Sequence, residues 1–179
     1  MIFTKTNLDG VLVLELERRE DERGFFARAW CREEFAAHGL NTQWVQANVG
    51  FTKKAGTVRG LHYQLAPYGE AKLLFCPKGA VFDVAVDVRP SSPTFKQWMG
   101  VELSEDNHKL FYVPEGFAHG YQALADNTEL FYMVSQFYTA GYERGARWDD
   151  PAFRIEWPAN VTIVSEKDKA WPDFAAEKG

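Results

Sequence analysis

The chain is dominated by short segments in which apolar and polar residues alternate. Such segments occur at residues 11–16, 43–48, 58–64, 72–76, 81–88, 98–103, 110–113, 120–124 and 129–134. A period of two is typical of half-buried strands, whose successive side chains point to opposite faces. Turns rich in Gly, Pro, Asp and Asn separate the segments. Short strands at this regular spacing predict an all-β barrel or jelly roll.

Helical patterns are few. One short helix is expected at residues 33–39, where Gly39 closes it and His38 in the last turn favours the helix dipole. The charged run 17–23 is expected to form a turn after the first strand. From residue 138 onward the chain is rich in Trp, Pro and Asp, and this segment is expected to pack over the barrel. Residues 1–179 are therefore predicted to form a single domain.

Composition narrows the class of protein. Of the 179 residues, 46% are hydrophobic and 15% aromatic, which favours a packed β-rich interior over disorder. The net charge is −5 and the basic residues are scattered, so neither nucleic acid nor membrane is an expected partner. Cys31 and Cys76 lack metal-type spacing and do not form a disulfide framework. The start resembles no signal peptide, and no stretch reaches membrane-spanning length, so a cytoplasmic location is expected.

The segment 58–64 holds the most informative polar residues. Leu61 and Tyr63 take one face of the expected strand. Arg59 and His62 are an odd number of residues apart, so they face opposite ways unless Gly60 introduces a bulge. A single buried histidine is more often a hydrogen-bonded core residue than a functional one. Only further polar residues elsewhere in the chain favour a functional role for His62.

Two other pairs of polar residues allow two interpretations each. Arg23 and Arg28 flank two phenylalanines, and they are either surface arginines or a phosphate-binding pair with an aromatic ring available for stacking. Gln46 and Asn48 share one face of a strand. Such amides are usually solvated, but inside a barrel they become hydrogen-bonding groups for a ligand.

The stretch from Pro114 to Gly120 resembles the second half-motif of the cupin superfamily. In metal-binding cupins its histidine, here His119, joins a histidine pair from the first half-motif. The corresponding residues here are His62, Tyr63 and Gln64, so a glutamine replaces one histidine. A three-nitrogen metal site cannot be assembled in the usual way, which disfavours a metal-dependent oxygenase.

Several longer motifs occur together in a fixed order. They are Asp21-Glu22-Arg23-Gly24-Phe25-Phe26, Arg59-Gly60-Leu61-His62, Lys72-Leu73, Val81-Phe82-Asp83-Val84, Ser92-Pro93-Thr94-Phe95, Pro114-Glu115-Gly116-Phe117-Ala118-His119-Gly120, Ile155-Glu156-Trp157-Pro158 and Ser165-Glu166-Lys167-Asp168. In this order they resemble the dTDP-4-dehydrorhamnose 3,5-epimerase family along nearly the whole chain. The resemblance implies a homodimeric, metal-free, cupin-like jelly-roll β-barrel with a few short helices. It also implies a nucleotide-diphospho-4-keto-6-deoxy sugar as substrate, with no cofactor.

The resemblance assigns catalytic roles to four residues. A ketone at carbon 4 acidifies the hydrogens on carbons 3 and 5, so a base of near-neutral pKa can remove one and leave an enolate. His62 matches the base, and Asp168 matches the carboxylate that orients it. Lys72 matches the cation beside the ketone oxygen, and Tyr132 the proton donor on the opposite face. By pattern alone Lys72 would be solvated, Tyr132 a core residue and Asp168 part of a surface loop.

The resemblance also assigns substrate-binding positions. Arg23 and Arg59 match the cations for the diphosphate. Further binding positions are Arg28, Gln46, Asn48, His119, Tyr138, Glu143 and Lys167. Asp83 is expected to orient His119 across the barrel.

Two departures from the family pattern bear on the substrate. Arg28 stands where the family usually has glutamate, and Ala47 where it commonly has aspartate. Both belong to the nucleotide-binding region of the family, so CDP- or GDP-linked sugars are alternatives to dTDP. The remaining alternatives are an epimerase that inverts only one carbon and a sugar-nucleotide-binding cupin without catalysis.

Overall fold

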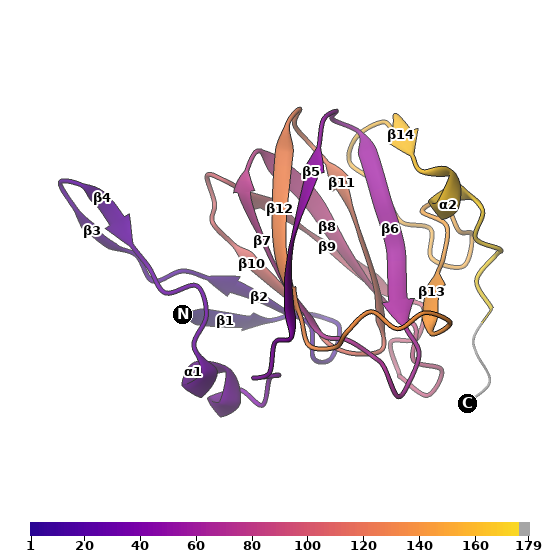
Figure 1. Cartoon of the computed structure of the whole chain (residues 1–179), viewed down its shortest axis with the longest axis horizontal. Helices are drawn as coiled ribbons and strands as arrows, with labels where there is room; N and C mark the ends of the chain where they lie inside the picture. Colours follow the sequence, from indigo (N-terminus) through magenta and orange to yellow (C-terminus); the bar gives the residue numbers. More distant parts are fainter. Residues whose placement is uncertain (176–179) are drawn as a thin grey trace.

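Two sheets face each other and form a jelly-roll barrel in the computed structural model, which describes residues 1–175 (Figure 1). The first sheet contains, in spatial order, β1 (Ile2–Lys5), β2 (Leu12–Glu15), β10 (Leu110–Val113), β7 (Lys72–Lys78), β12 (Thr128–Val134) and β5 (Gln46–Thr52). The second contains β13 (Glu143–Gly145), β6 (Thr57–Gln64), β11 (Phe117–Ala123), β8 (Ala80–Asp87) and β9 (Trp98–Ser104), with β14 (Ile163–Val164) beside β6. The all-β prediction is confirmed. Within residues 1–175, no helix is long and apolar enough to cross a membrane.

A hairpin replaces the turn that was predicted for the charged run 17–23. β3 (Arg19–Asp21) pairs with β4 (Gly24–Phe26), and Figure 1 shows this hairpin projecting away from the barrel. Every residue of both strands is exposed, so no buried face imposes an alternating pattern on the sequence. The prediction was wrong because alternation marks only strands that bury one side.

Two short helices occur in the described part of the chain. α1 (Arg32–Ala37) confirms the predicted helix: it buries Phe35 and ends at His38 and at Gly39, whose φ is +69°. α2 (Glu166–Lys169) lies in the charged run that the pattern had favoured as a surface loop. Ser165 caps α2 by accepting a hydrogen bond from the Asp168 N–H at 3.1 Å. The cap turns Asp168 inward, where only 4% of the residue is exposed.

The apolar residues divide among three layers. One core fills the space between the sheets, and α1 covers a second core on the outer face of the first sheet. A third core lies on the outer face of the second sheet, where Phe153, Trp157 and Phe174 pack. The prediction that the C-terminal segment covers the barrel is therefore confirmed.

A bulge in β6 is the local feature that shapes this cavity. His62 pairs with His119 of β11, whereas Gly60 pairs with the next residue of β11, Gly120. Leu61 is thus an extra residue in the ladder, and Gly60 adopts a φ of +101° that favours glycine. Of the two alternatives left open by the sequence, the structure has the bulge at Gly60, and both Arg59 and His62 line the cavity although their spacing is odd.

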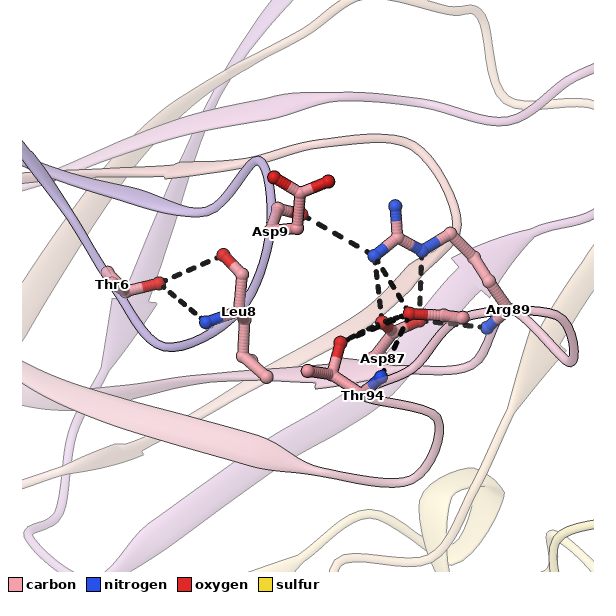
Figure 2. Close-up of polar contacts among 7 residues, drawn as sticks. Thr6, Leu8, Asp9, Asp87, Arg89 and Thr94 are labelled. Carbon is pink, nitrogen blue, oxygen red and sulfur yellow. Dashed lines mark hydrogen bonds and ion pairs between the residues drawn. The ribbon is translucent and has the colours of Figure 1, made fainter.

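A buried carboxylate holds the loop that follows β8 (Figure 2). Asp87 accepts hydrogen bonds from Arg89 Nε and Nη2 at 2.9 and 2.7 Å, from Ser92 Oγ at 2.5 Å and from Thr94 Oγ1 at 2.6 Å. Arg89 also donates to the carbonyl of Asp9 at 3.4 Å. One side chain therefore ties the 88–97 loop to the β8 strand and, through Arg89, to the first turn of the chain.

This network makes the folding stability of the protein depend on pH in the acidic range. Burial raises the pKa of Asp87, but the hydrogen bonds from Arg89, Ser92 and Thr94 outweigh it and lower the pKa from 3.8 to about 2. The ionised Asp87 stabilises the folded state by about 2 kcal/mol at every pH above its unfolded pKa of 3.8. This stabilisation is lost as the pH falls through the folded pKa of about 2. Asp87→Asn should destabilise the protein by about 2–4 kcal/mol at neutral pH and flatten this acid dependence.

Urea unfolding at neutral pH and at several acidic values measures both effects. The exposed Asp106→Asn is the matched control, and it should behave as the wild type. An Asp87→Asn protein with wild-type stability and the same acid dependence would contradict the assignment.

Candidate active site

A cavity of about 430 Å³ lies between the two sheets and opens beside α2. This volume is in the range of small-molecule sites. Side chains from both sheets and from α2 line it, among them Arg59, His62, Lys72, His119, Tyr132 and Asp168. The structure therefore gathers around one space the four residues that the resemblance made catalytic, which lie up to 106 residues apart in sequence.

His62 and Asp168 form a hydrogen-bonded pair. His62 Nε2 lies 2.7 Å from Asp168 Oδ1, and the Gly60 N–H donates to Asp168 Oδ2 at 3.3 Å. Burial raises the pKa of Asp168, but the hydrogen bonds from His62 and Gly60 outweigh it and the net pKa is lowered. Asp168 is thus an ionised partner for the imidazole at neutral pH. The His62 side chain lines the cavity and is 37% exposed, so the imidazole can be reached from the cavity.

Tyr132 faces this pair from the other sheet. It lies on β12 of the first sheet, whereas His62 lies on β6 of the second, so the two side chains approach the cavity from opposite walls. Burial raises the pKa of Tyr132, and the nearby Tyr121 adds to the effect. The phenol is therefore protonated at neutral pH and can act as a proton donor.

Lys72 supplies a buried positive charge. It begins β7 and is buried, and it forms an ion pair with Glu70. The pattern alone had favoured a solvated lysine at this strand end, and the structure places the side chain in the cavity wall instead. A fixed cation in a site with little water stabilises negative charge that develops on a nearby oxygen.

His119 is held by the carboxylate predicted for it. Its Nε2 lies 2.6 Å from Asp83 Oδ1, so the predicted contact is confirmed. The expectation that it spans the barrel was wrong, because β8 and β11 are paired neighbours in the second sheet. Asp83 is fully buried, and burial raises its pKa. Its second oxygen, Oδ2, has no hydrogen-bond partner in the described part of the chain.

Lys167 of the cavity wall belongs to a cluster with two other predicted binding residues, Glu143 and Tyr138, which do not line the cavity themselves. Lys167 Nζ donates to both carboxylate oxygens of Glu143, at 2.7 and 2.9 Å, and Tyr138 donates to the same carboxylate at 3.3 Å. Arg59 is exposed and is held by two contacts: its Nε donates to Thr52 Oγ1 at 3.2 Å and its Nη2 to the Phe51 carbonyl at 2.9 Å. Arg59 and Lys167 both line the cavity, and both are cations suited to a phosphate group.

Besides Tyr138 and Glu143, four predicted binding residues are not part of the cavity wall. Gln46 and Asn48 lie on β5, where Asn48 pairs with Tyr132, so they are close to the wall without being in it. Arg23 and Arg28 belong to the projecting hairpin and the segment after it. Arg23 pairs with Asp21, and Arg28 with Glu34 at 3.1 Å. The structure of one chain does not bring these two arginines to the cavity.

Six residues of the wall were missed by the sequence analysis, among them Tyr121 and Ser165. Tyr121 follows His119 by two positions in β11, so a period of two would have placed it on the same face. Ser165 lines the cavity as the N-cap of α2, which no apolar pattern marks.

Gln64, which replaces a cupin histidine, has a structural role. Its Nε2 donates to the carbonyls of Tyr68 and Phe137, both at 3.1 Å, and its Oε1 accepts from the Thr139 N–H at 2.7 Å. Its side chain therefore fixes two loops. Within residues 1–175, no three His, Cys, Asp or Glu side chains are grouped to hold a metal ion.

Known proteins resemble this chain over nearly its full length. The family model described as dTDP-4-dehydrorhamnose 3,5-epimerase matches residues 5–176. The dTDP-4-dehydrorhamnose 3,5-epimerase of Shigella flexneri is 46% identical over 94% of this chain and 93% of its own.

Two solved structures extend the comparison. A 3,5-epimerase from Legionella pneumophila in complex with dTDP-4-keto-L-rhamnose is 37% identical, with a TM-score of 0.89 over 95% of this chain and 90% of its own. A 3'-monoepimerase from Streptomyces bikiniensis in complex with dTDP-quinovose is 31% identical, with a TM-score of 0.87 over 94% of this chain and 86% of its own.

Proposed function

The chain belongs to the dTDP-4-dehydrorhamnose 3,5-epimerase family and is an epimerase of that class, and we propose that the cavity between its two sheets is where the reaction takes place. The observation that carries this proposal is the placement of the His62–Asp168 pair and Tyr132 on opposite walls of one cavity. Inversion of a carbon needs that arrangement, because a single base that returns its own proton restores the starting configuration.

The proposed reaction begins with proton removal from a nucleotide-linked 4-keto-6-deoxy sugar. His62 takes the proton from carbon 3 or carbon 5, and the C–H electron pair moves toward the ketone to give an enolate. Lys72 stabilises the negative charge on the enolate oxygen. Tyr132 then donates its phenolic proton to the same carbon from the opposite face, and exchange with solvent restores both side chains. Acid–base steps of this kind each contribute roughly 10²- to 10⁴-fold to a rate.

The charge state of the cavity supports this assignment. The lowered pKa of Asp168 keeps a negative charge beside the imidazole, which stabilises the imidazolium formed after proton removal. The raised pKa of Tyr132 keeps the donor protonated until the enolate forms. Arg59 and Lys167 supply positive charge for the diphosphate.

The test is solvent deuterium incorporation into dTDP-4-keto-6-deoxyglucose, followed by NMR and mass spectrometry. Deuterium should enter at carbons 3 and 5 with the wild type, because each inversion replaces one carbon-bound hydrogen. His62→Ala should slow incorporation at both carbons by roughly 10²-fold or more. Tyr132→Phe should retain exchange through His62 but lose inversion. His38→Ala, at the end of α1, is the matched control and should leave both rates unchanged.

Other outcomes of the deuterium experiment would favour other activities or substrates. Wild-type exchange at one carbon only would favour a mono-epimerase, the activity named for the Streptomyces bikiniensis relative. Exchange with CDP- or GDP-linked keto sugars but not with the dTDP sugar would reassign the nucleotide, as Arg28 and Ala47 allow. Full exchange in His62→Ala would contradict the proposed base.

We also propose that the enzyme is a homodimer in which the hairpin of one subunit completes the cavity of the other. The hairpin projects from the barrel in Figure 1, and the Arg23 side chain is 85% exposed, as is 71% of Phe26. The outward face of the edge strand β5 exposes Val49 and Phe51. Both features are costly on an isolated subunit and are explained by contact with a second copy.

Subunit mixing tests this arrangement. His62→Ala and Arg23→Ala proteins should each have low activity at limiting substrate. If Arg23 acts on the partner's cavity, a hybrid dimer contains one cavity with both His62 and the partner's arginine, so unfolding and refolding the two variants together should restore activity. If Arg23 acts on its own cavity, or not at all, no hybrid site is improved and the mixture stays at the mean of the two variants. A monomeric sedimentation profile would also contradict the proposal.

A further inference from the structure

Tyr121 is a second phenol in the cavity wall, and the proposed chemistry does not use it. It lies two residues after His119 on β11 and pairs across the ladder with Arg59 of β6. Only 6% of the residue is exposed. A buried hydroxyl normally has a hydrogen-bond partner, so the contacts of this one are informative.

The Tyr121 hydroxyl has a single, long contact. Its oxygen lies 3.4 Å from Thr52 Oγ1, beyond the usual length of a hydroxyl pair, and residues 1–175 supply no other hydrogen-bond partner. Thr52 Oγ1 is already the acceptor for Arg59 Nε at 3.2 Å. Burial raises the pKa of Tyr121, so the phenol keeps its proton at neutral pH. A proton is therefore available for an acceptor in the cavity.

The facing strand leaves room at this hydroxyl. A Cβ atom at Gly50 of β5 would lie 3.1 Å from the Tyr121 oxygen, which is closer than most such contacts. The φ angle of Gly50 is not in the left-handed region, so the backbone does not require glycine at this position. The absence of a side chain at Gly50 instead keeps space around the polar end of Tyr121.

The register of the second sheet divides the cavity into two rows. One row holds His62 and His119, which pair with each other, and the next holds Arg59 and Tyr121. The first row contains the proposed base. The second row contains a permanent cation beside a phenol whose one hydrogen-bond contact is long, which suits an oxyanion more than a neutral group.

We propose that Tyr121 is a substrate-binding residue that donates its hydroxyl to a phosphate oxygen of the nucleoside diphosphate, beside Arg59. This deepens the proposed function and rests on it for the class of ligand. Because the bond is made to a part of the substrate that does not react, it stabilises ground state and transition state equally. Its loss should therefore raise KM and leave kcat unchanged.

Tyr121→Phe removes the hydroxyl and keeps the ring, so it is the variant to test. Its dissociation constant for dTDP, measured by titration calorimetry, should rise about 10-fold, as expected for one hydrogen bond to a charged group. KM should rise by a similar factor with kcat unchanged. Tyr112→Phe is the matched control, because its buried hydroxyl accepts from the Asn41 N–H at 3.1 Å outside the cavity. It should bind dTDP as the wild type does.

Three results would overturn the proposal. Wild-type dTDP affinity in Tyr121→Phe would mean that the hydroxyl binds no phosphate, and a lower kcat with unchanged dTDP affinity would place it at the sugar instead. Failure of the wild type to bind dTDP, CDP or GDP would remove the ligand itself. A wild type that binds dTDP but catalyses no exchange would contradict the proposed function and not the role of Tyr121. The role of Tyr121 is decided separately, by the dTDP affinity of Tyr121→Phe.

Discussion

The cavity depends on one backbone irregularity, the bulge in β6. An uninterrupted strand would turn either Arg59 or His62 toward the outer core, because their spacing is odd. The extra residue, Leu61, takes the outer core position, and Gly60 takes the left-handed backbone conformation. The Gly60 N–H also donates to Asp168 at 3.3 Å, so the same irregularity anchors the carboxylate that holds His62.

Two buried carboxylates in this barrel have opposite pKa shifts, and their surroundings explain the difference. Asp168 accepts hydrogen bonds from His62 and from the Gly60 N–H, and these outweigh the cost of burial. Asp83 is more deeply buried, and its Oδ2 has no hydrogen-bond partner within residues 1–175, so burial dominates and its pKa is raised. The histidine with the firmly ionised partner is the one assigned as the base. The His119 side chain is less exposed than that of His62, at 11% against 37%, and His119 is assigned to substrate binding.

The sequence predicted most of the barrel because most strands bury one face and therefore alternate. The odd spacing beside Gly60 left two alternatives open, a regular strand with Arg59 and His62 on opposite faces or a bulge, and the alternation alone did not decide between them. The hairpin β3–β4 could not be predicted in this way because all its residues are exposed. The burial of Asp168 could not be predicted from its charged neighbours either, since it depends on β6, more than a hundred residues earlier. Only the family resemblance selected it.

The most direct test of this account is a crystal structure of the protein with dTDP bound. The two-row cavity predicts that the diphosphate contacts Arg59 and that the free end of the diphosphate points toward His62 and Tyr132, where the sugar would follow. A dTDP molecule bound outside the cavity, or one whose base lies between His62 and Tyr132, would contradict it.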